Sequence, residues 1–224
     1  LFYGYQTNGV YASTAEAKAA GLYQVDASGD KVYFQAGDMR FVDTDGNGCI
    51  DDNDRVVIGD PNPSVYGNIY SRLNWKRWSL DVTMTYCLGN DIFNYERSIL
   101  ESGKYFYNQT KAMNGRWTTD GQQTDIPRIS YQDPHGNARF SDRWIEDGSY
   151  LRLSNVTLSY ALPVNSTFLQ GITVWGSAMN LFTITKYLGS NPDCALSGNV
   201  LAQGIDRGLL GLGRSFAMGV KINL

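Results

Sequence analysis

The chain of 224 residues is poor in charged side chains and contains no run of lysine and arginine. Charged residues make up 18% of it, whereas soluble domains typically contain roughly 25%. The formal net charge is only −3. Because nucleic-acid binding needs a basic patch or stripe, we do not expect nucleic acid as a partner.

Long apolar stretches are also missing. No stretch of about 18 apolar residues occurs, which excludes a transmembrane helix. The same observation does not exclude a membrane β-barrel, because the strands of such barrels are only about 10 residues long and alternate in polarity. The chain begins at Leu1 without Met and without a basic segment followed by an apolar core, so no signal peptide is expected in it. We therefore expect a fragment of a longer protein or a processed product.

Cysteine and histidine are scarce, with three and one residues respectively. Cys49, Cys87 and Cys194 are widely spaced and form no CxxC pair, so a zinc site is not expected. A Cys49–Cys194 disulfide is compatible with an oxidising compartment, but we favour free thiols. His135 lies in the turn-like run Asp-Pro-His-Gly-Asn, where a surface-loop role is favoured over catalysis.

No catalytic constellation can be assembled from the remaining residues. The sequence has no GxSxG elbow, HExxH motif or phosphate loop. Glu96, Glu101 and Glu146 are of the type that glycosidases use in pairs, but nothing positions them two by two. We therefore predict that the chain is not an enzyme.

Aromatic residues and glycine are abundant, with 15 Tyr, 9 Phe, 5 Trp and 24 Gly. This composition favours an all-β protein, either a membrane barrel or a soluble sandwich. Period-two alternation is clearest at Ser79 to Leu88 and at Ser215 to Leu224. Weaker strands are predicted at Tyr3 to Tyr11, Val65 to Trp75, Tyr150 to Leu162, with a bulge near Ser154–Asn155, and Gly171 to Leu181.

Short and long connections alternate between these strands. Residues 76–78 and 163–170 are short links, whereas 35–64, 89–149 and 182–212 are long. Outer-membrane barrels have this alternation of short periplasmic turns and long extracellular loops. A helix from Ile92 to Met113 is predicted in one long loop, and Tyr105, Phe106, Tyr107 and Trp117 there either stack on sugar rings or pack the loop.

The sharpest local motif is an aspartate-rich stretch of twelve residues that begins at Asp43. Its spacing follows the calcium loop of an EF-hand, in which oxygen ligands occur at fixed positions and a glycine allows a sharp turn at Gly48. The seventh position contributes a backbone carbonyl, so the thiol there is incidental. The predicted Ca²⁺ ligands are Asp43, Asp45, Asn47, Cys49, Asp51 and Asp54.

Three features distinguish this loop from an EF-hand sensor. The last position is Asp54 rather than Glu, which shortens the bidentate reach. No amphipathic helix flanks the loop, and only one copy is present. The alternative is a turn that orders itself through side-chain-to-backbone hydrogen bonds without a metal.

Several segments in order resemble the SusC/RagA-type family of TonB-dependent outer-membrane transporters. The similarity runs through nearly the whole chain, and the ordered set is more specific than any one segment. The final residue, Leu224, departs from the Phe that often ends barrel proteins. The matching segments are Gly37 to Asp43 with the aspartate-rich loop, Asp54 to Pro63 with Tyr66-Gly67, Gly89 to Asn94, Arg116 to Thr118, Ile126 to Arg128, Trp144 to Tyr160, Asn180 to Tyr187 and Asn191 to Asp193.

The resemblance implies that residues 1–224 are the C-terminal segment of a large antiparallel transmembrane β-barrel, without its plug domain and earlier strands. It implies import of oligosaccharides or peptides across the outer membrane of a gram-negative bacterium. The implied partners are a SusD-like surface lipoprotein, the TonB complex and outer-membrane lipid. The alternative is a secreted calcium-stabilised β-domain that binds glycans or surfaces.

Overall fold

The computed structural model describes residues 1–164, 168–194 and 202–223. It divides into two compact units, which are treated separately below. The sheet unit comprises Pro63–Asn90, Asp147–Asp193 and Leu209–Leu224. The loop unit comprises Leu1–Asn62, Asp91–Glu146 and Cys194–Gly208.

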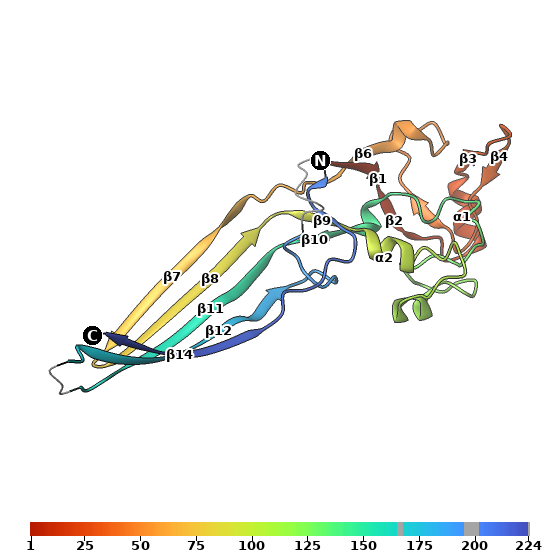
Figure 1. Cartoon of the computed structure of the whole chain (residues 1–224). Helices are drawn as coiled ribbons and strands as arrows, with labels where there is room; N and C mark the ends of the chain where they lie inside the picture. Colours follow the sequence, from red (N-terminus) through yellow and green to blue (C-terminus); the bar gives the residue numbers. More distant parts are fainter. Residues whose placement is uncertain (165–167, 195–201, 224) are drawn as a thin grey trace. The chain divides into compact units, whose positions relative to one another are not determined.

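The sheet unit is one antiparallel sheet of five strands in the order β14-β12-β11-β8-β7 (Figure 1). Neighbouring strands are joined by main-chain hydrogen bonds, and β7 and β8 are linked by a tight turn in which Lys76 has a φ of 55°. The strands are β7 (Val65–Trp75), β8 (Trp78–Leu88), β11 (Tyr150–Leu162), β12 (Gly171–Thr185) and β14 (Ser215–Asn223).

The predicted strands of this sheet are confirmed. β7 and β11 have the predicted bounds, whereas β12 continues four residues beyond Leu181 to Thr185. The bulge is also confirmed, because the register of β11 against both neighbours shifts between Leu153 and Asn155. Residues 165–167 of one predicted link, residues 195–201 of one predicted loop, and Leu224 lie outside the described residues.

Side chains of one kind form rows across the five strands. One row, in which each residue pairs with the next on the neighbouring strand, consists of Leu73, Leu80, Leu158, Gly176 and Met218. The adjacent row consists of Arg72, Asp81, Thr157, Ser177 and Ala217. Because successive residues of a strand point to opposite faces, one face of the sheet is apolar and the other is polar. The side chain of Met218 is 89% exposed, so the apolar face has no protein cover there.

Two glycines of the sheet lie beneath aromatic rings. A Cβ atom on Gly67 would lie 2.9 Å from the hydroxyl of Tyr86, its direct cross-strand partner. A Cβ on Gly219 would lie 2.7 Å from the Trp175 ring, again its direct partner. The first pair belongs to the apolar face and the second to the polar face, as the alternation along each strand requires. Each ring therefore occupies the space that a side chain would otherwise fill.

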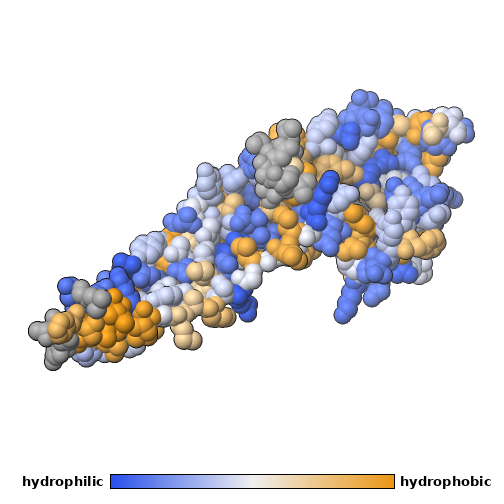
Figure 2. Space-filling view, viewed as in Figure 1, coloured by the Kyte–Doolittle hydropathy of each residue, from blue (hydrophilic) through white to orange (hydrophobic). Residues whose placement is uncertain are grey.

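Residues of high hydropathy gather at the end of the sheet that holds the C-terminus (Figure 2). The row there joins Trp75, Trp78, Tyr160, Val174 and Val220. The rings of Trp78 and Tyr160 are 4.6 Å apart. This end of the apolar face thus carries an aromatic cluster.

The loop unit is made of short elements around its own core. Its helices are α1 (Thr14–Ala20), α2 (Tyr95–Leu100) and the 3₁₀ turns η1 (Asp52–Asp54), η2 (Lys111–Gly115) and η3 (Asp142–Trp144). Its strands are β1 (Phe2–Tyr5), β2 (Thr7–Val10), β3 (Tyr23–Val25), β4 (Lys31–Tyr33), β5 (Met39–Phe41), β6 (Arg55–Gly59), β9 (Asp91–Asn94), β10 (Ile145–Asp147) and β13 (Ile205–Asp206).

The core of the loop unit lies between β1, β2, β5 and α1. Its buried side chains include Tyr11, Met39, Phe41 and Ile50. The pairing of β2 with β5 and of β1 with β6 brings these residues together from distant parts of the chain. Cys49, Cys87 and Cys194 are free thiols in the structure.

Two predicted elements of this unit are wrong in their extent. The helix expected from Ile92 to Met113 is reduced to α2, because residues 91–94 form β9 and the Asn94 side chain caps α2 by accepting a hydrogen bond from the Arg97 N–H. The strand expected from Tyr3 to Tyr11 is divided into β1 and β2, which pair with different partners. Among the described residues, no helix has the length and apolar character needed to cross a membrane.

Candidate functional site

The aspartate-rich loop joins β5 to η1 and β6. Gly46 and Gly48 adopt φ values of 74° and 80°, a region that residues with a Cβ rarely occupy. The loop is held to β3, because the Tyr23 N–H donates to the Gly48 carbonyl at 3.2 Å and the Ile50 N–H donates to the Tyr23 carbonyl at 2.8 Å. Ile50 is buried in the core. The loop is therefore fixed at its middle as well as at its ends.

Asp43 organises the first half of the loop. Its two carboxylate oxygens accept hydrogen bonds from the backbone N–H groups of Gly46 and Gly48, both at 2.8 Å. Partial burial opposes the charge on Asp43, but the Gly48 and Gly46 donors outweigh it and hold the pKa of this carboxyl below its ordinary value. The carboxylate is thus charged under all ordinary conditions.

Asp54 closes the second half of the loop from a fully buried position. Its side chain is 0% exposed and accepts hydrogen bonds from the Thr44 N–H at 2.6 Å and the Asp51 N–H at 2.9 Å. Asp51 in turn accepts from the Asn53 N–H at 2.7 Å, which forms a reciprocal capping box around η1. A buried carboxylate of this kind needs its donors, because a buried unpaired charge is very costly.

Three of the six predicted ligands are brought together. One carboxylate oxygen from each of Asp43, Asp45 and Asp54 lies within 4.8 Å of the other two. Asn47 adjoins them, since its side-chain N–H donates to Asp45 at 2.9 Å. The carboxylate of Asp51 and the thiol of Cys49 are not in the cluster. This all-oxygen donor set suits a hard cation such as Ca²⁺.

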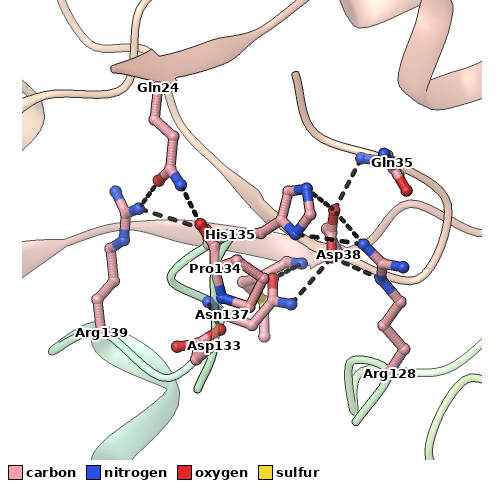
Figure 3. A network of polar contacts seen from close by, with 10 residues as sticks. Gln24, Gln35, Asp38, Arg128, Asp133, Pro134, His135, Asn137 and Arg139 are labelled. Carbon is pink, nitrogen blue, oxygen red and sulfur yellow. Dashed lines mark hydrogen bonds and ion pairs between the residues drawn. The ribbon is translucent and has the colours of Figure 1, made fainter. Parts of the chain in front are cut away.

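A second polar centre, which the sequence patterns did not indicate, surrounds Asp38 (Figure 3). Asp38 is 0% exposed and accepts hydrogen bonds from Arg128 Nε at 2.8 Å and Asn137 Nδ2 at 2.9 Å. It also accepts from the Gln35 N–H at 2.8 Å, and His135 lies 3.9 Å away. His135 is therefore a buried member of this network and not the surface residue that its turn-like sequence favoured.

Two of the three carboxylates considered as glycosidase acids, Glu101 and Glu146, pair with arginine instead. Arg97 donates from Nε to Glu101 at 3.0 Å and from Nη1 to Glu146 at 2.5 Å. Beside them, burial and repulsion from Arg97 lower the pKa of Arg143 to about 10. Because Glu101 and Glu146 both pair with Arg97, this cluster has the character of a structural ion-pair network.

Comparison with known proteins gives consistent similarities. No family model matches the chain. TonB-dependent receptor P3 of Formosa agariphila is 31% identical over 229 residues, covering 99% of this chain and 22% of the receptor. TonB-dependent receptor SusC of Bacteroides thetaiotaomicron is 25% identical, covering 81% of this chain and 17% of SusC. The chain thus spans about a fifth of the length of the relatives it matches.

Solved structures agree with the sequence relatives. A structure of the RagAB peptide transporter matches 99% of this chain with a TM-score of 0.67 and 25% identity, over 22% of that chain. The RagAB peptide importer in its open-open state matches the fold with a TM-score of 0.69 at 22% identity. The five-stranded sheet is therefore a part of the β-barrel of such receptors. The chain belongs to the SusC/RagA-type TonB-dependent receptors of the gram-negative outer membrane, and it corresponds to a C-terminal portion of them.

Proposed function

We propose that this chain forms part of the wall and outer loops of an importer of oligosaccharides or peptides, working with the TonB complex and a SusD-like lipoprotein. The observation that carries the proposal is the sheet with one exposed apolar face and one polar face. A soluble sandwich buries its apolar face against a second sheet, whereas a barrel turns it toward lipid.

The aromatic cluster at the end of the sheet that holds the C-terminus supports a membrane boundary there. Trp75 and Trp78 are exposed on the apolar face, and Tyr160 packs against Trp78. Tryptophan and tyrosine are enriched at membrane interfaces because their rings are apolar and each carries one polar group. We assign this end of the strands to the periplasmic interface of the lipid bilayer.

The opposite face supports a hydrated path. On the polar face, Arg72 of β7 forms an ion pair with Asp81 of β8, its direct register partner. Thr83 and Lys221 belong to the same face by strand alternation. Charged groups are costly in hydrocarbon but stable in a water-filled lumen, so we assign these residues to the barrel interior.

The proposal is tested on the full-length parent protein in a gram-negative host. Recovery in the outer-membrane fraction, a gel mobility that changes on heating, and loss of labelled glycan or peptide uptake on gene deletion are expected. Co-purification of a lipoprotein encoded in the same genome would support the SusD-like partner. Recovery as a soluble monomer without detergent would instead support a secreted calcium-stabilised β-domain, the alternative function.

We further propose that the aspartate-rich loop binds Ca²⁺. The close approach of Asp43, Asp45 and Asp54 supports this, since three carboxylates at such distances repel each other unless a cation or hydrogen-bond donors compensate them. Equilibrium dialysis of the full-length protein against radioactive calcium should give one bound ion, and Asp45→Ala should abolish its binding. Absence of binding at millimolar calcium would leave the loop as a self-ordered turn.

A further inference from the structure

The hairpin of β3 and β4 has one edge that no strand occupies among the described residues. The two strands form a sheet of their own, with the register Tyr23↔Tyr33, Gln24↔Val32 and Val25↔Lys31. The Phe34 N–H donates to the Leu22 carbonyl, so hydrogen-bonded pairs fall at every second residue from there. The N–H and C=O of Lys31 and Tyr33 therefore point away from β3.

The opposite edge of the hairpin is already taken. By the same alternation, the N–H and C=O of Tyr23 point away from β4, and both are bonded to the aspartate-rich loop at Gly48 and Ile50. No backbone partner occupies the corresponding groups of Lys31 and Tyr33 within the described part of the chain. Among the described residues, the edge of β3 is thus occupied at Tyr23, whereas β4 has an open edge at Lys31 and Tyr33. Such an edge is a template for pairing with another extended chain.

A hollow of about 700 Å³ follows this edge. Residues 31–36 all line it, and the other walls are α1, at Ala17 and Lys18, together with Trp117 and Arg128. Lys31, Val32 and Tyr33 form β4, and because all three line the hollow, it lies beside this strand. The volume lies within the range of ordinary ligand sites.

The charge of the hollow selects its occupant. Lys18 and Lys31 are exposed cations on its rim, and no Asp or Glu lines it. Arg128 is also on the wall, but the buried Asp38 matches its charge. Trp117 supplies apolar surface. Unpaired main-chain groups favour a peptide over a sugar, and the two lysines favour acidic side chains on it.

We propose that the open edge of β4 binds an extended acidic peptide, which adds a third strand to the β3–β4 hairpin. Its N–H and C=O groups pair with those of Lys31 and Tyr33, and its acidic side chains lie near Lys18 and Lys31. The inference rests on the proposed import function and narrows the cargo to peptides. The occupant is a free cargo peptide and not a segment of the lipoprotein.

Hydrogen exchange followed by mass spectrometry on the full-length receptor in detergent tests this directly. A synthetic peptide that alternates Asp and Val is added to the receptor without lipoprotein. Slower exchange is expected across residues 31–34, because the amides of Lys31 and Tyr33 gain acceptors. A peptide that alternates Lys and Val should give no protection.

Two pairs of variants separate this mechanism from nonspecific effects. Tyr33→Pro removes the outward N–H without touching the β3 ladder, and should weaken binding of the acidic peptide at least about tenfold. Tyr33→Val loses the same ring but keeps the N–H, and should bind as the wild type does. Lys18→Glu with Lys31→Glu should also weaken binding about tenfold, whereas Lys104→Glu should not. Lys31 and Lys104 each lie over a tyrosine ring, at 4.1 Å and 5.5 Å from its centroid, which makes Lys104 a matched control.

Equal binding in all variants would overturn the inference. So would protection of residues 31–34 by an acidic oligosaccharide such as oligogalacturonate, or by the purified lipoprotein in place of the peptide. Uptake by cells is measured separately. A receptor that imports glycans while showing no peptide protection would refute the β4 site and leave the import function standing; peptide protection without any uptake would refute import instead.

Discussion

Two aspartate variants of the proposed calcium loop should differ in how much they destabilise the loop without metal. Asp45 is exposed, and it accepts hydrogen bonds from the Asn47 backbone N–H at 3.1 Å and side-chain N–H at 2.9 Å. Replacing Asp45 by Ala leaves N–H donors that water can bind. The metal-free loop should therefore lose less than about 1 kcal/mol of stability. Asp54 is buried, and Asp54→Ala leaves the Thr44 and Asp51 N–H groups without acceptors. At about 1–3 kcal/mol for each stranded donor, the metal-free loop should lose about 2–6 kcal/mol.

The stabilisation that bound calcium gives the loop can be estimated separately. Extracellular calcium loops have dissociation constants of roughly 10⁻⁴ to 10⁻³ M. At about 10 mM calcium, a ligand at 10 to 100 times its dissociation constant stabilises the bound state by about 1.4–2.7 kcal/mol. The wild type should gain this amount, and Asp45→Ala should gain almost nothing. The gain belongs to local opening of the loop and not to the whole barrel.

Hydrogen exchange of residues 43–54 in the full-length protein measures both quantities. Exchange is compared in calcium, in magnesium and in chelator, for the wild type and the two variants. Protection by calcium alone in the wild type, lost in Asp45→Ala with little change in chelator, is the expected pattern. A wild type whose exchange ignores calcium, or an Asp45→Ala variant that keeps the full calcium effect, would refute the assignment of ligands.

Three further predictions concern the loop unit. Arg97→Met should destabilise the loop unit by about 3–5 kcal/mol in chemical unfolding, because two buried carboxylates lose the positive charge that neutralises them. Arg143→Met should be neutral or stabilising, because Nη1 of Arg143 is buried without a hydrogen-bond partner among the described residues. Asp43 has a folded pKa below its ordinary 3.8. Its stabilising contribution should therefore be complete above about pH 5 and should disappear as the pH falls through the folded value, which proteolysis of the loop at stepped pH would reveal. Gly37→Ala should cost about 2–4 kcal/mol, because Gly37 has a φ of 84° and a Cβ there would overlap the Trp117 ring; unchanged thermal unfolding would contradict it.

The strands of the sheet were predictable because they obey a local rule. A strand with one wet face and one apolar face alternates with period two, and β7 and β8 carry that pattern through their full length. Even the bulge in β11 left a trace, as a change of phase at Ser154–Asn155. The turn formed by the aspartate-rich loop could also be predicted from the sequence, because side-chain-to-backbone hydrogen bonds within twelve residues fix its geometry.

The loop unit was less predictable because its contacts are long-range. Asp38 meets Arg128 and Asn137, which lie 90 and 99 residues away in the sequence. No local pattern encodes such pairing. The predicted helix from Ile92 to Met113 failed for the same reason, since β9 is held by pairing with β13 across more than a hundred residues. A strand of four residues has too little periodicity to compete with a helical pattern.

The two glycine–aromatic pairs of the sheet have a consequence for how the barrel wall tolerates change. In each pair an aromatic ring covers a glycine on the neighbouring strand, Tyr86 over Gly67 and Trp175 over Gly219. A larger residue at the glycine would displace the ring from its position over the neighbouring strand, whereas a smaller residue in place of the ring leaves room for the glycine to change later. Substitutions at these sites should therefore be accepted in one order only, aromatic first and glycine second, so each pair is inherited as a unit even though its members belong to different strands.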